Sequence, residues 1–135
     1  MKILVAYYSK TGTTRKVAQA VIAEKNCDFD EVHFDEKTKL IDYVRDPSEY
    51  ERVVLLAPVW AFSLAEPMKM YVAENKSKIK QYDLIVTCGA FGLRGCIKHC
   101  SSSIGKRPDN AVKLKAKDVK RDSYDIGAIL YSFYS

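Results

Sequence analysis

Residues 3–15, Ile-Leu-Val-Ala-Tyr-Tyr-Ser-Lys-Thr-Gly-Thr-Thr-Arg, decide the fold. An apolar, β-prone run leads into a hydroxyl-rich loop around Gly12, and a helical pattern follows. A strand, a tight loop and a helix N-terminus in succession point several backbone N–H groups at one place, with the positive end of the helix dipole behind them. The loop is therefore expected to hold a phosphate. The alternative is an ordinary strand–helix turn whose Ser and Thr side chains only cap the helix.

Length and composition favour one soluble domain over residues 1–135. Hydrophobic residues make up 47% of the chain and charged residues 29%, which is ordinary for a globular protein and excludes a disordered one. The apolar run near the N-terminus is too short for a signal-peptide core or a membrane span. We therefore expect a cytoplasmic protein that makes no contact with a membrane.

The four cysteines are expected to stay reduced, because no secretory signal precedes them. Cys96 and Cys100 are spaced to share one helix face with His99, which leaves a metal site or a redox pair open. No second cluster of ligands would complete four-coordination, and cysteine often serves as a small buried apolar residue. The sequence therefore predicts no metal site.

The formal net charge is +5, and much of the excess falls in residues 106–121. A basic C-terminal third favours an acidic protein partner or a weak contact with a polyanion. A solvated surface explains the same charges. No nucleic-acid-binding motif accompanies them, so we expect no nucleic-acid partner.

Hydrophobic periodicity predicts strands at 2–8, 29–34, 50–58, 82–89 and 111–116. Helical patterns cover 13–25, 66–79 and 94–104, and a short helix is expected around Leu40, Ile41 and Val44. Asp122-Ser-Tyr-Asp125 resembles a capping box before a final amphipathic helix. Strands that alternate with helices predict an α/β fold with a parallel sheet and helices on both faces.

Such sheets bind ligands beyond the carboxyl ends of their strands, where three loops of this chain are expected to meet. Besides residues 9–14, they are residues 58–66, which carry the only Trp, and residues 88–95, which carry three glycines. Trp60 could stack on a flat ligand, or it could roof the core together with Phe62. The glycines permit either close approach of a ligand or only a tight turn. A phosphate site beside an aromatic loop describes a pocket for FMN.

At this point the chain resembles the flavodoxin family. Tyr8-Ser-Lys-Thr-Gly-Thr-Thr14 matches the family's phosphate loop, and Pro58-Val-Trp60 and Thr87-Cys-Gly-Ala-Phe-Gly92 look like its two ring-binding loops. The resemblance implies a flavodoxin-like three-layer α/β/α sandwich, with a five-stranded parallel sheet in the order 2-1-3-4-5. The residues that it assigns to FMN are Ser9, Lys10, Thr11, Gly12, Thr13, Thr14, Pro58, Val59, Trp60, Ala61, Cys88, Gly89, Phe91, Gly92 and Gly95.

The chain departs from the family in two ways. Flavodoxins usually have a glycine in the second loop, and none lies between Pro58 and Glu66. A non-glycine residue that takes a positive φ there is expected to cost about 1 kcal/mol. Flavodoxins are also typically acidic, whereas this chain is basic, which again favours an acidic redox partner.

The leading hypothesis is an FMN-binding carrier that passes electrons between redox partner proteins. No catalytic side chain is expected, because the flavin performs the chemistry. Three alternatives remain: a small FMN-dependent NAD(P)H:quinone-type reductase, an activator flavodoxin that serves one metalloenzyme, and a flavodoxin-like interaction domain without a cofactor.

Overall fold

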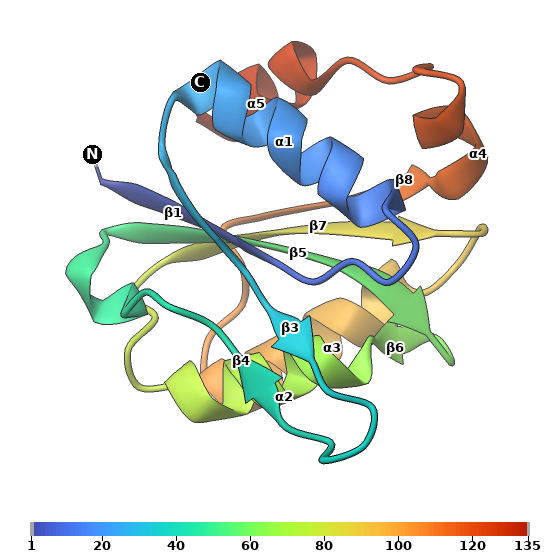
Figure 1. Cartoon of the computed structure of the whole chain (residues 1–135). Coiled ribbons are helices and arrows are strands. Elements are labelled where there is room, and N and C mark those ends of the chain that lie inside the picture. Colours follow the sequence, from blue (N-terminus) through green and yellow to red (C-terminus); the bar gives the residue numbers. More distant parts are fainter. Residues whose placement is uncertain (1, 135) are drawn as a thin grey trace.

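A central parallel sheet forms the middle layer of the computed structural model, which describes residues 2–134 (Figure 1). Its strands are β1 (Ile3–Tyr7), β2 (Asp28–Glu31), β5 (Arg52–Trp60), β7 (Tyr82–Cys88) and β8 (Asn110–Lys115). Their order across the sheet is β2-β1-β5-β7-β8, and every neighbouring pair is parallel. Numbered among themselves these strands follow 2-1-3-4-5, so the expected order is confirmed.

Helices cover both faces of this sheet (Figure 1). α1 (Thr13–Lys25), α4 (Ala116–Lys120) and α5 (Ile126–Tyr134) lie on one face, and α2 (Glu66–Asn75) and α3 (Leu93–Ile104) lie on the other. The three-layer architecture is therefore confirmed. None of the helices within residues 2–134 is long and apolar enough to cross a membrane.

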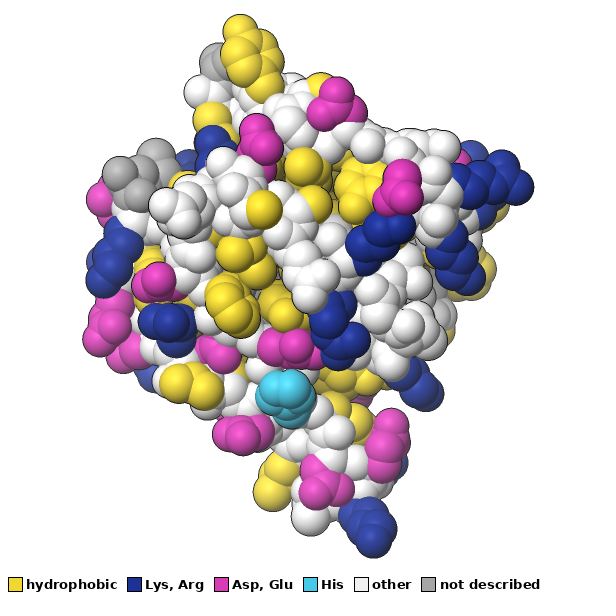
Figure 2. Space-filling model, turned by 45° about the horizontal axis from the view of Figure 1, so that its top comes forward, with side chains coloured by type: hydrophobic (Ala, Val, Ile, Leu, Met, Phe, Trp, Pro, Cys, Tyr) yellow, Lys and Arg dark blue, Asp and Glu magenta, His cyan; other side chains and the backbone are white. Residues whose placement is uncertain are grey.

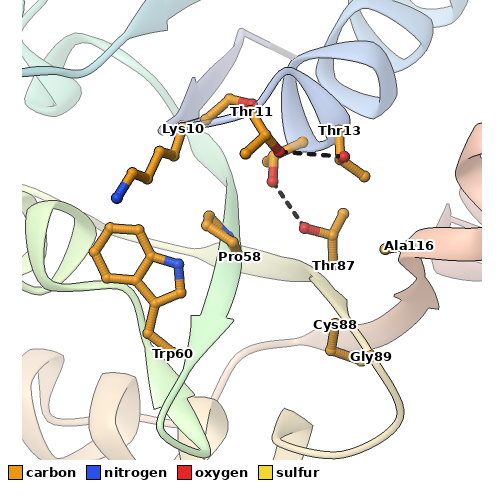
Figure 3. A pocket seen from close by; sticks show the side chains of 11 residues that line it. Lys10, Thr11, Thr13, Pro58, Trp60, Thr87, Cys88, Gly89 and Ala116 are labelled. Atoms are coloured by element: carbon orange, nitrogen blue, oxygen red, sulfur yellow. Dashed lines mark hydrogen bonds between the residues drawn. The ribbon is translucent and has the colours of Figure 1, made fainter.

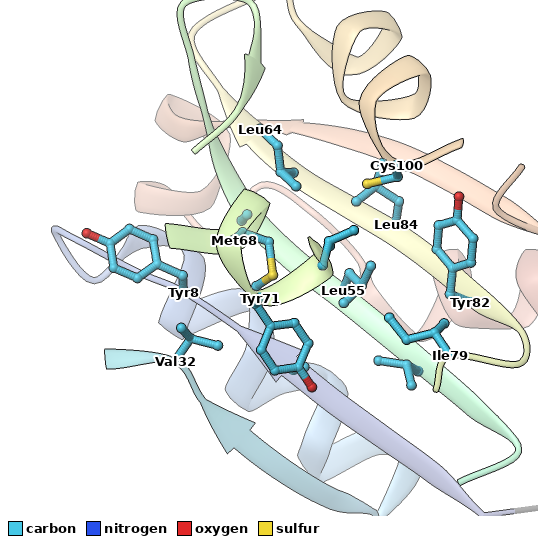
Figure 4. Packing of buried hydrophobic residues seen from close by; sticks show 14 of the residues in the cluster. Tyr8, Val32, Leu55, Leu64, Met68, Tyr71, Ile79, Tyr82, Leu84 and Cys100 are labelled. Carbon is cyan, nitrogen blue, oxygen red and sulfur yellow. The ribbon is translucent and has the colours of Figure 1, made fainter. Parts of the chain in front are cut away.

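The two central strands are buried on both sides, which explains their unbroken apolar runs. Leu55 and Leu84 point to the face of α2 and α3, where they pack in a cluster with Met68 (Figure 4). Val54 and Ile85 belong to the second cluster, under α1 and α5. Alternate residues of each strand thus support opposite layers.

The prediction of a short helix around Leu40, Ile41 and Val44 is wrong. Strands β3 (His33–Phe34) and β4 (Ile41–Asp42) form an antiparallel hairpin there, followed by the short 3₁₀ helix η1 (Pro47–Glu49). The Asp35 carboxylate accepts hydrogen bonds from two backbone N–H groups at the hairpin tip, which stabilises a turn instead of a helix. Two of the three apolar residues that suggested a helix, Leu40 and Val44, are 64% and 90% exposed, whereas Ile41 packs against the core.

Strand β2 is shorter than the expected 29–34, and it buries a carboxylate while an aromatic side chain is left outside. Phe29 is 49% exposed, whereas Asp30 is buried. The Asp30 carboxylate accepts the N–H of Val44 at 3.0 Å and of Arg45 at 2.6 Å. This carboxylate therefore ties the chain after β4 to the edge of the sheet, which an alternation of apolar residues could not predict.

The helices differ from the sequence prediction in one boundary and in one additional helix. Helix α2 ends at Asn75, and α4 was not expected. The residue that caps α5 is Asp125, whose Oδ1 accepts the N–H of Ala128 at 3.0 Å. Asp122, the first residue of the expected capping box, instead pairs with Lys16 Nζ at 2.6 Å.

A buried polar network lies at the start of β5 and β7, far from the carboxyl ends of the strands. Asp83 is fully buried, and its Oδ1 accepts hydrogen bonds from Arg52 at 2.9 Å and from Asn110 at 2.8 Å. The Tyr134 hydroxyl donates to Asp83 Oδ2 at 2.7 Å, and Arg52 also pairs with Asp109 at 3.0 Å. Burial raises the pKa of Tyr134, and the Asp83 carboxylate adds to the rise. The network joins three strands to the C-terminal helix.

Candidate functional site

The three loops meet at one edge of the sheet and enclose a cavity of about 190 Å³ (Figure 3). The first loop contributes the turn before α1, the second the end of β5, and the third the end of β7. The lining residues are Ser9, Lys10, Thr11, Thr13, Thr14, Pro58, Trp60, Thr87, Cys88, Gly89 and Ala116.

The N-terminus of α1 opens onto this cavity without a negative charge of its own. Gly12, at φ 98°, makes the turn into the helix, and no side chain caps the helix end from that position. Ser9 Oγ accepts the N–H groups of Gly12 and Arg15, each at 3.1 Å. Within residues 2–134 the N–H groups of Thr13 and Thr14 have no acceptor, and the first turn holds no Asp or Glu. These features are the ones that suit a helix end to an anion.

Hydroxyl groups surround the same helix end. Thr11 Oγ1 lies 3.5 Å from Thr13 Oγ1, and Thr14 Oγ1 lies 2.8 Å from Thr87 Oγ1 (Figure 3). The Thr14–Thr87 pair is buried and bridges the first and third loops beneath the cavity. The sequence analysis quoted Thr87 in a ring-binding motif but did not assign it to the site, although its position as the last polar residue of a buried strand was a usable signal. Ala116 was missed too, and it carries no comparable signal.

Lys10 is the positively charged residue that lines the cavity. Arg15 lies beside the loop, but its guanidinium pairs with Glu31 at 2.5 Å, and the Tyr7 hydroxyl donates to the same carboxylate at 3.0 Å. Hydrogen bonding from Arg15 lowers the pKa of Glu31, and burial together with Glu31 raises the pKa of Tyr7 to about 12. Lys10 forms no ion pair within the described residues, and its Nζ lies 5.6 Å from the centre of the Trp60 ring.

Trp60 lines the cavity next to Lys10 (Figure 3). Its ring is half-buried, and it makes an edge contact with Tyr8 at a centroid distance of 5.7 Å. Trp60 therefore both packs on the core and lines the cavity. Phe62 does not roof the core, because 73% of its surface is exposed.

The second loop is a tight hairpin. Strand β5 continues to Trp60 and turns back through two residues into β6 (Ser63–Leu64), which pairs antiparallel with it. The turn residues Ala61 and Phe62 have φ values of 50° and 63°. Non-glycine residues pay about 1–2 kcal/mol in this region, so the strain expected from the missing glycine is present in the structure.

We expect Ala61→Gly to raise the free energy of unfolding by about 0.5–1 kcal/mol, because relief of the left-handed strain outweighs the added chain entropy. Urea denaturation of the purified protein measures the change. The matched control is Ala73→Gly, the same replacement at an exposed position inside α2, which should lower the stability by about 1 kcal/mol. Equal losses at both positions would contradict the assignment of strain to the turn.

Two glycines of the third loop pack against this hairpin. A Cβ on Gly95 would lie 2.0 Å from the Phe62 carbonyl oxygen, and one on Gly92 would lie 2.2 Å from Val59 Cγ1. Gly92 also has a φ of 126°. These glycines therefore allow the N-terminus of α3 to approach the hairpin closely. The sequence pattern left close approach of a ligand or a tight turn open, and the resemblance assigned both residues to FMN.

The sequence prediction groups the remaining site residues differently from the structure. Val59, Ala61 and Phe91 do not line the cavity, but they line an adjoining groove of about 370 Å³ together with Phe62, Gly89 and Ala90. Gly89 lines both spaces and thus joins the groove to the cavity.

The cysteines divide between the site and the core. Cys88 lines the cavity at 5% exposure, and burial raises its thiol pKa. Cys96 and Cys100 are fully buried in the apolar cluster, and burial raises their pKa values to about 11 and about 12. Thiols that stay protonated are poor metal ligands. Residues 2–134 contain no group of three or more His, Cys, Asp and Glu side chains placed to hold a metal ion.

A sequence model of the flavodoxin domain matches residues 4–135. The chain belongs to this family. A search of curated protein sequences gave no match.

Solved structures share the fold of this flavodoxin domain at low sequence identity. A flavoprotein from Lactobacillus acidophilus NCFM, crystallised in complex with FMN, superposes with a TM-score of 0.75 at 20% identity, covering 91% of this chain and 99% of its own. The Trp repressor binding protein from Bacillus subtilis superposes with a TM-score of 0.63 at 15% identity, covering 94% of this chain and 96% of its own. The Fusobacterium nucleatum flavodoxin bound to flavin mononucleotide superposes with a TM-score of 0.56 at 19% identity, covering 82% of this chain and 68% of its own.

Proposed function

We propose that the chain binds FMN at the cavity and acts as an electron-transfer protein. The observation that carries this proposal is the N-terminus of α1. The N–H groups of Thr13 and Thr14 have no acceptor within residues 2–134, the first turn holds no acidic residue, and this helix end opens onto the same cavity as Trp60. A phosphate fits the helix end, and an aromatic side chain beside it fits a flat ring.

The lining residues match the two chemically different ends of FMN. Thr11, Thr13 and Lys10 would contribute hydroxyl groups and a positive charge to a phosphate at the helix end. The cavity of about 190 Å³ is smaller than the typical cofactor pocket of about 300–1,000 Å³. We therefore place the phosphate end inside it and the ring beside Trp60, towards the adjoining groove.

Bound FMN would supply the redox chemistry, namely the acceptance and release of electrons at its ring. The protein's own part is to bind and orient that group. No Asp, Glu or His of the described residues lines the cavity; its titratable side chains are Lys10, at the end proposed for the phosphate, and Cys88, whose thiol pKa is raised by burial. This composition favours electron transfer over the conversion of a substrate by the protein itself.

Titration of the apo-protein with FMN tests the proposal. Because Trp60 is the only Trp in the chain, quenching of its fluorescence reports binding at this site. Riboflavin should bind at least about 100-fold more weakly, because it lacks the phosphate and its charge-assisted hydrogen bonds. Inorganic phosphate should compete with FMN but leave the fluorescence of Trp60 largely unchanged.

Two results would contradict the FMN site. Unchanged Trp60 fluorescence in a colourless protein would favour an interaction domain without a cofactor. Equal affinities for FMN and riboflavin would contradict the phosphate position at α1. Ser132→Ala, a change on the exposed side of α5 far from the cavity, serves as the control variant and should bind both ligands like the wild type.

The groove beside the cavity favours one second candidate, a small NAD(P)H-dependent reductase. Its lining by Val59, Ala61 and Phe62 leaves an open apolar space where a second substrate could lie next to the ring. Rapid oxidation of NADPH by the purified holoprotein alone, with a quinone as acceptor, would favour the reductase. No oxidation above the rate of free FMN would favour the carrier.

A further inference from the structure

The net positive charge of the chain comes from one segment. Residues 89–121 contain nine Lys or Arg and two Asp, whereas the rest of the chain contains thirteen Lys or Arg and fifteen Asp or Glu. One of the two aspartates, Asp109, is already paired with Arg52. This segment starts in the third loop of the candidate site and ends after α4. The net charge of +5 therefore arises in this segment and not in the rest of the chain.

Three exposed lysines of this segment lie next to the cavity. Lys113 Nζ donates to the Ala90 carbonyl in the third loop at 2.9 Å. Lys115 stands opposite the cavity residue Cys88 in the sheet register, and Lys117 directly follows the cavity residue Ala116. None of the three forms an ion pair within residues 2–134. Figure 2 shows Lys and Arg side chains gathered on the side of the molecule where α4 lies.

An apolar centre lies beside these lysines. Phe62 is 73% exposed and Phe91 is 72% exposed, and both line the groove that adjoins the cavity. Lys113 Nζ lies 5.8 Å from the centre of the Phe91 ring. Exposed aromatic side chains in the middle and charged groups at the rim are typical of a protein–protein interface. We call Phe62, Phe91, Lys113, Lys115 and Lys117 the docking face.

Resting on the FMN site proposed above, we infer that the docking face binds an acidic redox protein. The two phenylalanines would contact the partner at the centre, next to the groove, and the three lysines would pair with its carboxylates. A protein fits better than a nucleic acid, because the lysines occupy one rim only, and Glu31 lies behind the phosphate loop on another side of the cavity. Complementary charge steers such encounters and fixes their orientation.

Electron transfer to two haem proteins of opposite charge tests the inference. The holoprotein, reduced with dithionite, is mixed in a stopped-flow instrument with oxidised cytochrome b5, which is acidic, or oxidised cytochrome c, which is basic. One electron passes from the reduced flavin to the ferric haem, which becomes ferrous, and a proton from the flavin goes to solvent. The rate with cytochrome b5 should fall at least about tenfold between about 20 mM and about 500 mM salt. The rate with cytochrome c should stay level or rise.

A charge-reversed variant and a matched control locate the effect. The triple variant Lys113→Glu, Lys115→Glu and Lys117→Glu should reverse the preference and the sign of the salt dependence with cytochrome b5. The control triple Lys37→Glu, Lys76→Glu and Lys78→Glu changes the net charge by the same amount. Its exposed positions lie on the β3–β4 hairpin and after α2, and it should keep the wild-type preference. A third variant, Phe62→Ser with Phe91→Ser, should slow the reaction with little change in its salt dependence.

FMN absorbance, recorded for every variant before mixing, separates the two proposals. A wild-type protein that does not retain FMN contradicts the proposed function and the inference that rests on it. Retained FMN without a preference for cytochrome b5, or equal effects of the two triple variants, contradicts the docking face alone. Binding of duplex DNA that only the first triple variant loses, without a preference for the acidic protein, would assign the face to nucleic acid and also overturn the inference.

Discussion

Replacement of Asp83 by Asn is expected to lower the free energy of unfolding by about 3 kcal/mol, the largest stability loss predicted for a single substitution here. Asp83 is fully buried and accepts hydrogen bonds from Arg52, Asn110 and Tyr134. Without its negative charge, the 10%-exposed Arg52 side chain retains only one carboxylate, that of Asp109. A buried charge that loses its partner is costly, because the cost of its removal from water is no longer offset.

Guanidinium denaturation of the two proteins measures this loss. Asp109→Asn is the matched control, because the same chemical change then falls on a side chain that is 43% exposed, and it should cost about 1 kcal/mol or less. FMN affinity should stay at the wild-type level in both variants, since the network lies at the opposite ends of the strands from the cavity. Equal losses from the two substitutions would contradict the buried pairing with Asp83.

Gly95→Ala is expected to weaken FMN binding at least about tenfold and to lower stability by about 1–3 kcal/mol. Its Cβ would lie 2.0 Å from the Phe62 carbonyl oxygen, a backbone atom that can yield only if the hairpin moves. The hairpin carries Trp60, which lines the cavity, so displacement of the hairpin changes the wall of the cavity. Gly95 therefore acts by positioning the hairpin and need not touch the cofactor.

Fluorescence titration and urea denaturation together test this positioning role. Gly127→Ala provides the control, because its Cβ would meet only the ends of the Asp125 and Glu24 side chains, at 3.3 Å and 3.4 Å. That variant should bind FMN normally. If Gly95→Ala loses stability but keeps both its FMN affinity and its Trp60 quenching, the close packing serves the fold and does not position the site.

The elements that sequence reasoning placed correctly are those whose signal is local. Strands β5 and β7 are continuous apolar runs because both of their faces are buried. Burial on both faces can therefore be recognised from a few consecutive residues. The hairpin of β3 and β4 was missed for the converse reason. The carboxylates of Asp30 and Asp35 bind backbone N–H groups of the chain around it, and the pattern of apolar residues carries no trace of these bonds.

The same distinction divides the candidate site. Residues 9–14 form one contiguous loop before a helix, so the sequence by itself determined the place of this loop at the helix end and, through the order of the strands, its meeting with Trp60. Only the tertiary structure decided that Thr87 lines the cavity and contacts the hydroxyl of Thr14, 73 residues away. The same holds for the close packing of Gly95 against the carbonyl group of Phe62. Local backbone geometry and burial are encoded by neighbouring residues, whereas contacts between distant loops exist only after the sheet has brought their strands together.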